Sequence, residues 1–160
     1  MSLSDVEIRT AIKREEFKTT PHISKINPAG VDLRIDRDLS LLPHTNTLVA
    51  SLERVELSNS LLGILHVRSS LAREGLFASL ALVDPGFQGQ LTVSLYNAGD
   101  RRVNLKRGER FIQLSLFRLS KPASREYRGR YQNSQGVVMS RRRKKSYHRR
   151  MESIIQGHGG

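Results

Sequence analysis

Two short stretches of the chain carry side chains suited to chemistry on a phosphorylated substrate. The first, residues 68–73, reads Arg-Ser-Ser-Leu-Ala-Arg and places two guanidinium groups and two hydroxyls within six positions. Such groups donate several hydrogen bonds to one phosphate. The second, residues 83–90, sets Asp84 on a Pro-Gly turn three residues before Phe87. Phosphate donors followed by an acid favour a nucleoside triphosphate substrate, with Asp84 activating water and Phe87 packing against a sugar.

Each stretch also has a plainer interpretation. Residues 68–73 could form a solvated basic turn capped by the two serines, and Asp, Pro and Gly are common residues of hairpin turns. Taken alone, the two stretches leave both interpretations open.

The composition excludes several kinds of site. The chain has no cysteine, which rules out disulfides, thiolate metal sites and the zinc-dependent deaminases whose metal needs cysteine ligands. Its five histidines are scattered without the paired spacing of metal ligands. No apolar run is long enough to cross a bilayer, and no signal region begins the chain, so we expect a cytoplasmic protein without a membrane partner.

Positive charge is concentrated at the C-terminal end. Of a net charge of +12, residues 121–160 contribute +9. We therefore expect a domain over residues 1–120 and a basic C-terminal tail over residues 121–160. Residues 141–150 carry seven fixed positive charges, which suit contact with nucleic acid. The alternatives are a solvated tail and a helix over residues 141–156 that docks on a neighbouring subunit.

Apolar periodicity predicts the elements that position these stretches. A capping box at Ser4 and Glu7 predicts one short helix over about residues 5–15. We expect residues 37–47 to form a loop, and a phase slip near Glu53 predicts a bulge. Eight to ten short strands at regular spacing predict a β-sandwich or barrel; the clearest cover residues 31–36, 48–57, 62–67, 76–83 (buried on both faces), 91–96, 103–105 and 112–116.

The motifs, in this order, resemble the superfamily that joins trimeric dUTP diphosphatases to metal-independent dCTP deaminases. Residues 67–76 resemble its phosphate-binding motif, residues 82–89 its sugar and base motif, and residues 107–114 the motif that follows. Residues 3–9, 27–34 and 131–141 resemble the deaminase branch in particular, and the likeness covers about residues 3–141.

This resemblance implies an all-β fold, a distorted jelly roll close to a sandwich-like barrel, with one short N-terminal helix and the basic tail. It also implies a homotrimer whose active sites are shared between subunits. Mg²⁺ would be held mainly through the triphosphate, without protein ligands of its own.

The resemblance further implies a role for each residue of the site. Asp84 would orient the water that attacks the α-phosphorus. The phosphates would be held by Arg68, Ser69, Ser70, Arg73 and Gln113. The sugar and base would contact Phe87, Thr92, Val93 and Ser94, and the tail would close over the nucleotide through Tyr127, Arg130 and Tyr131.

Position 94 departs from the deaminase branch. The glutamate that handles protons in cytosine deamination lies ten residues after the Asp84 position, where this chain has Ser94. A hydroxyl without an adjacent base cannot replace a carboxylate near neutral pH. The base-contacting glutamine of the deaminase tail is here Ser134, although Gln132 and Gln135 lie nearby and a register shift could restore the contact.

We therefore predict a dUTP diphosphatase, which hydrolyses dUTP to dUMP and pyrophosphate. One alternative is a dCTP deaminase that uses another proton-transfer residue, with or without diphosphatase activity. The other is a non-catalytic member that binds nucleotide or nucleic acid.

Overall fold

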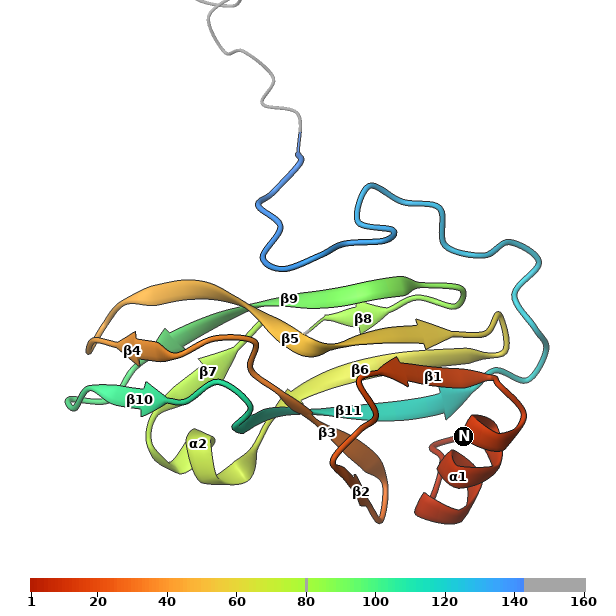
Figure 1. Cartoon of the computed structure of the whole chain (residues 1–160), viewed down its shortest axis with the longest axis horizontal. Helices are drawn as coiled ribbons and strands as arrows, with labels where there is room; N and C mark the ends of the chain where they lie inside the picture. The colour runs from red at the N-terminus through yellow and green to blue at the C-terminus, as the bar shows by residue number, and fades with distance from the viewer. Residues whose placement is uncertain (80, 143–160) are drawn as a thin grey trace, which may run out of the picture.

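Two antiparallel sheets pack face to face around one apolar core (Figure 1). The computed structural model describes residues 1–79 and 81–142. The first sheet has four strands, in the order β1 (Phe17–Thr20), β5 (Asn46–Leu57), β9 (Gln88–Asn97) and β7 (Leu76–Ala78). The second has five, in the order β2 (Lys25–Asn27), β3 (Gly30–Arg34), β11 (Arg110–Arg118), β6 (Leu61–Val67) and β8 (Leu82–Val83). The predicted all-β, sandwich-like jelly roll is confirmed.

Strict alternation of apolar and polar residues builds the core between the sheets. In β9 one set of alternate side chains is buried, while the set between them lies on the outer face. Strand β6 alternates in the same way, and β11 does so from Ile112 onward, so the two sheets meet through matching apolar faces. The buried apolar residues contributed by these three strands are Leu61, Leu65, Leu91, Val93, Leu95, Phe111, Ile112, Leu114 and Leu116.

The predicted N-terminal helix is confirmed as α1 (Asp5–Lys13), ending two residues before its expected limit. Its capping box is complete: Glu7 Oε2 accepts hydrogen bonds from the backbone N–H and the hydroxyl of Ser4, both at 2.9 Å. These bonds hold the pKa of Glu7 below its usual value, the backbone bond having the larger effect. Ile8 and Ala11 face the core, which anchors the helix beside the sheets.

The predicted bulge in the long strand is also confirmed. The register between β5 and β9 shifts between Ala50 and Arg54, so residues 51–53 leave the regular ladder. This irregularity frees polar groups of β5 for other partners.

The strand predicted over residues 76–83 is wrong. The chain divides there into β7, which pairs with β9 in the first sheet, and β8, which pairs with β6 in the second. Because the chain crosses between sheets, its apolar residues are not covered on both sides. Phe77 is 63% exposed and Leu82 is 57% exposed.

Three further elements differ from the sequence-based expectation. Residues 37–47 are not all loop, because they include β4 (Leu39–Leu41), which pairs with β10 (Val103–Leu105) in a separate two-stranded sheet. The phosphate motif contains a short helix, α2 (Ser69–Arg73). Strand β1 was not predicted, because four residues beside a helix give too short a pattern.

The described part of the tail, residues 121–142, contains no helix or strand and runs along the outside of β9 (Figure 1). A parallel bridge joins Gly89 to Ser134. None of the helices in the described ranges is both long enough and apolar enough to cross a membrane.

Candidate functional site

A pocket of about 310 Å³ lies between the body of the protein and the tail. From the body it is lined by Asp84, Phe87 and Thr92, which the sequence proposed for the site. From the tail it is lined by Tyr127 and Tyr131, which were also proposed. The volume lies within the range of small-molecule sites. Five residues far apart in the sequence are thus brought to one cavity.

A tight turn presents Asp84 to this pocket. The Asp84 carbonyl accepts a hydrogen bond from the Phe87 backbone N–H at 3.0 Å. Gly86 takes a φ of +82°, which the third residue of such a turn requires and which side chains disfavour. Phe87 is 7% exposed, and its ring lies 5.7 Å from that of Tyr127 at an interplanar angle of 56°. The segment is therefore both a turn and a pocket wall.

The three predicted base-contacting residues of β9 have different positions. Thr92 lines the pocket, and its hydroxyl accepts a hydrogen bond from the Val138 backbone N–H at 3.0 Å. The Val93 side chain is fully buried in the core. Ser94 follows Thr92 on the outer face, where its backbone N–H donates to the Ser79 hydroxyl at 3.1 Å. Of the three, only Thr92 contributes to the pocket lining.

Asp84 is the single carboxylate among the described residues that line the pocket. The glutamines of the tail do not add an amide to it. The Gln132 amide bonds the backbone of Gly86, Gln88 and Tyr127, and Gln135 lines a separate polar pocket of about 300 Å³. The register shift considered above therefore does not bring a tail glutamine into the pocket.

The predicted phosphate ligands gather elsewhere. Arg68, Ser69 and Gln113 line a second pocket of about 390 Å³, together with Asn27 and Asp32. Ser70 and Arg73 lie on the exposed side of α2 and do not line that pocket.

Strand β6 separates the two groups within one chain. Val83, next to Asp84, pairs with Gly63 near the start of β6, whereas Arg68 directly follows the end of that strand. Gly63 and Arg68 are five residues apart, and a strand rises about 3.3 Å per residue, so Asp84 and Arg68 lie about 17 Å apart along the strand. One chain by itself therefore does not bring Asp84 and Arg68 together.

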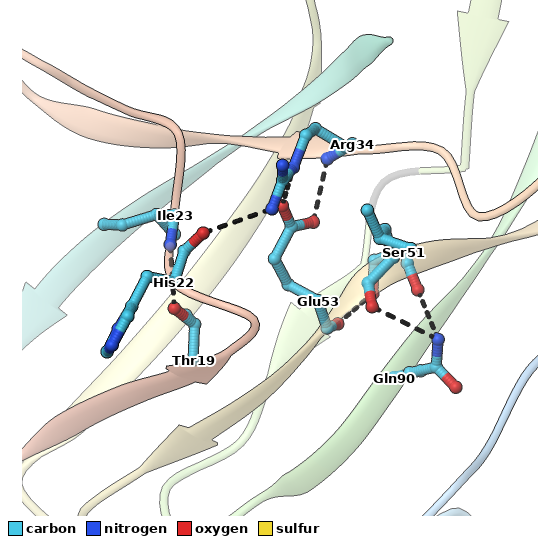
Figure 2. Close-up of polar contacts among 8 residues, drawn as sticks. Thr19, His22, Ile23, Arg34, Ser51, Glu53 and Gln90 are labelled. Atoms are coloured by element: carbon cyan, nitrogen blue, oxygen red, sulfur yellow. Dashed lines mark hydrogen bonds and ion pairs between the residues drawn. The ribbon is translucent and has the colours of Figure 1, made fainter. Parts of the chain in front are cut away.

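Gln90 fixes the tail over the pocket. Its backbone N–H donates to the Ser134 carbonyl at 2.9 Å, and its side-chain oxygen accepts from the Gly136 N–H at 2.7 Å. Its side-chain nitrogen donates to the Ser51 carbonyl at 2.7 Å, in the β5 bulge (Figure 2). One side chain thus connects the bulge to the tail.

The bulge itself is held by an ion pair whose carboxylate is buried. Glu53 is fully buried and accepts hydrogen bonds from the backbone N–H of Arg34 at 2.8 Å and from its Nε at 2.6 Å (Figure 2). Arg34 also donates to the His22 carbonyl at 3.1 Å. The sequence located this bulge but not the ion pair, because the two partners are 19 positions apart.

Arg130 secures the far end of the described tail. Its guanidinium donates to the Arg141 carbonyl at 2.6 Å, while the Arg141 guanidinium donates to the Arg130 carbonyl at 2.5 Å. Arg130 therefore ties the tail to itself and does not line the pocket. Most of the basic stretch over residues 141–150, and nearly all of the helix considered over residues 141–156, lie outside the described residues.

Over residues 1–79 and 81–142, no three His, Asp or Glu side chains gather closely enough to hold a metal ion.

Comparison with known proteins places this architecture in a family. A family model described as dCTP deaminase-like matches residues 35–119. The dCTP deaminase of Thermococcus kodakarensis is 40% identical over 159 residues, covering 90% of this chain and 100% of that protein. The chain belongs to the dCTP deaminase-like family.

Relatives named for other activities match nearly the same part of the chain. A dUMP-forming dCTP deaminase of Aquifex aeolicus is 35% identical, covering 88% of this chain and 94% of that protein. A probable deoxyuridine 5'-triphosphate nucleotidohydrolase of Sulfolobus islandicus rod-shaped virus 1 is 32% identical, covering 88% and 99% respectively. Family membership therefore does not separate hydrolysis from deamination.

Solved structures agree on the fold. The deaminase of Agrobacterium tumefaciens, which acts on 2'-deoxycytidine 5'-triphosphate, has a TM-score of 0.63 at 16% identity, covering 72% of this chain and 48% of that one. The native EIAV dUTPase has a TM-score of 0.58 at 21% identity, covering 69% and 93% respectively.

Replacing Gly89 should release the tail from β9. Gly89 has a φ of +149°, and an added Cβ would lie 2.8 Å from the Ser134 backbone nitrogen. Because backbone cannot retreat as a flexible side chain does, we expect Gly89→Ala to undock residues 131–141. Limited trypsin digestion should then cleave after Arg130 at least about ten-fold faster, since proteolysis follows local opening.

Gly108→Ala is the matched control. Gly108 has a φ of +86°, but an added Cβ there meets nothing within 4 Å. It should leave cleavage after Arg130 unchanged. Equal cleavage of both variants and the unmodified chain would show that the Gly89 contact does not hold the tail.

Proposed function

We propose that the protein is a dUTP diphosphatase, which hydrolyses dUTP to dUMP and pyrophosphate. The observation that supports this most is the lone carboxylate of the pocket, Asp84, together with a serine at position 94. Hydrolysis at phosphorus needs one group to orient and deprotonate water. Deamination of cytosine needs a carboxylate that passes protons to and from the base, and no second acid lines the pocket in the described residues.

In the proposed reaction, the Asp84 carboxylate accepts a proton from water as the water oxygen bonds to the α-phosphorus. The bond from the α-phosphorus to the bridging oxygen of the β-phosphate breaks, and pyrophosphate leaves with the bond electrons. Phe87, held by Tyr127, packs against the deoxyribose, where a 2'-hydroxyl would crowd its ring. Backbone groups of β9 read the uracil beside Thr92.

The phosphates are held by Arg68, Ser69 and Gln113, with Ser70 and Arg73 at the edge of the same surface. Guanidinium groups and hydroxyls stabilise charge that builds on the departing pyrophosphate. Mg²⁺, bound through the triphosphate oxygens, supplies further charge neutralisation.

We further propose a homotrimer in which Asp84 of one subunit meets Arg68 of its neighbour. The separation of the two groups along β6 supports this, because neither can complete a site within one chain. Exposed apolar side chains also favour a covering subunit. Leu82, in the pocket lining, is 57% exposed, and the paired residues Phe77 and Tyr96 of β7 and β9 are 63% and 41% exposed.

dCTP deamination remains the second candidate, because relatives at 40% identity are named dCTP deaminases. In that case a group other than the residue at position 94 must carry the protons.

Product analysis separates these functions. The full chain is incubated with Mg²⁺ and dUTP, and separately with dCTP, and products are resolved by chromatography. We expect dUMP and pyrophosphate from dUTP, and unchanged dCTP. Formation of dUTP or dUMP from dCTP would establish deamination instead. No turnover of either nucleotide, with salt-sensitive DNA binding lost on deleting residues 141–160, would indicate the non-catalytic alternative.

Asp84→Asn should lower kcat for dUTP by about 10²–10⁴-fold, the usual contribution of a general base. Asparagine keeps the size of the side chain but cannot accept the proton. Asp100→Asn is the control, because the Asp100 side chain is 99% exposed on a distant turn. Unchanged turnover by Asp84→Asn would mean that water is activated elsewhere.

Subunit mixing tests the shared site. Asp84→Asn and Arg68→Gln are each expected to be inactive, and the two are co-expressed with different affinity tags. Random trimers should recover activity at about one quarter of their sites, where an intact Asp84 meets an intact neighbouring Arg68. If each site were built within one subunit, mixed trimers would show no recovery.

A further inference from the structure

We propose that Asp32 is a positioning residue that holds the guanidinium groups of Arg68 and Arg110 toward a bound polyphosphate, and that Arg110 is a further phosphate ligand. The proposal rests on the function proposed above, because it assigns phosphates to the pocket that Arg68 lines. Neither Asp32 nor Arg110 was among the residues that the sequence indicated for the site.

Asp32 is a buried carboxylate with three partners. It is 2% exposed, in the middle of β3. Its Oδ1 accepts a hydrogen bond from the Asn27 side chain at 2.7 Å. Its Oδ2 lies 3.5 Å from Arg68 Nε and 3.4 Å from Arg110 Nη1. A single carboxylate oxygen therefore lies between two guanidinium groups.

The strand register explains why the carboxylate lies there. Asp32 pairs directly with Lys25 on β2 and with Gln113 on β11, and Gln113 pairs in turn with His66 on β6. Directly paired residues point to the same face of a sheet. These four side chains form one polar row across the five-stranded sheet. Asp32 is the only acid in the row, beside two arginines at the end of the sheet where α2 begins.

A second buried acid, Glu53, determines which arginines pair with Asp32. Arg34 and Arg110 are direct partners across β3 and β11, so two like charges face each other. Glu53 binds the Arg34 guanidinium at 2.6 Å and draws it toward the β5 bulge (Figure 2). Arg110 therefore pairs with Asp32 instead. The two acids thus separate two adjacent arginines: Arg34 pairs with Glu53 at the bulge, and Arg110 pairs with Asp32, which lines the pocket.

Both arginines keep unused donors. Their side chains are 29% exposed for Arg68 and 36% for Arg110, and each guanidinium carries five N–H groups. Asp32 accepts a hydrogen bond from Arg110 Nη1 at 3.4 Å and forms an ion pair with Arg68 Nε at 3.5 Å. Arg68 also donates to the Arg110 carbonyl at 3.2 Å, which fixes the two side chains relative to each other. Arg68 lines the pocket together with Asn27, Ser69 and Gln113. Arg110 adjoins this pocket through Asp32, which also lines it.

The negative charge of Asp32 offsets the repulsion between the guanidinium groups of Arg68 and Arg110. Without the carboxylate, two guanidinium groups at this spacing repel each other and turn toward solvent. An incoming polyphosphate would then have to order both side chains itself, which lowers affinity. An ion pair that only joined β3 to β11 would affect stability but not phosphate affinity.

Inorganic tripolyphosphate with Mg²⁺ is the probe, with binding to the full chain measured by titration calorimetry. It contains no base or sugar, so the result stands whether the protein hydrolyses dUTP or deaminates dCTP. We expect Asp32→Asn to weaken binding about ten-fold. Asparagine still accepts the Asn27 hydrogen bond and has the same shape. Asp38→Asn is the control and should have no effect, since Asp38 holds Lys106 and the Arg107 backbone on an exposed surface.

A double variant separates positioning from a structural role. If Asp32 acts through the arginines, Asp32→Asn should weaken binding by less than about three-fold when Arg110→Gln is already present. Arg110→Lys keeps the positive charge but loses the forked N–H donors of the guanidinium, so this variant by itself should weaken tripolyphosphate binding. It provides the test if Asp32→Asn does not fold. No tripolyphosphate binding by the unmodified chain, unchanged binding by Asp32→Asn or by Arg110→Lys, or a full ten-fold loss in the double variant would overturn the proposal.

Discussion

The ion pair between the fully buried Glu53 and the partly exposed Arg34 is the constraint on which the architecture around the pocket depends. A buried carboxylate is tolerated only when its oxygens are satisfied, and here both accept hydrogen bonds from one residue of β3. The pair joins the two sheets at the bulge of β5. There, Ser51 can accept from the Leu91 backbone N–H and from the Gln90 side chain, which also bonds the tail. Sheet packing, bulge and tail are therefore parts of one hydrogen-bonded unit.

The same sheets keep the two halves of the proposed site apart. Strand β6 carries Arg68 at one end and pairs with the strand leading to Asp84 at the other. A rigid strand cannot shorten, so chemistry that needs both groups requires more than one copy of the chain.

Much of this fold follows from local sequence patterns. Strict alternation identified β9 and β11, the capping box identified α1, and a phase slip identified the bulge in β5. The apolar run over residues 76–83 led to a wrong prediction of one strand. Side-chain type alone does not show where a chain leaves one sheet for another. For the site, Asp84, Phe87 and the tail tyrosines line one pocket, and their roles there stay predictions. Asp32, Gln90 and Glu53 escaped notice because their partners are distant in sequence, and long-range pairing leaves no local pattern.

The tail provides about one third of the residues that line the pocket, among them Tyr131, Ser134 and Val138. Ligand affinity and tail docking are thermodynamically linked for this reason: a molecule that touches both walls stabilises the docked tail by the same free energy that the docked tail adds to binding. A change that loosens the tail, even far from the ligand, then appears as weaker affinity rather than as a lower unfolding temperature. The affinity of the pocket for a ligand thus depends on how firmly the tail is docked against β9.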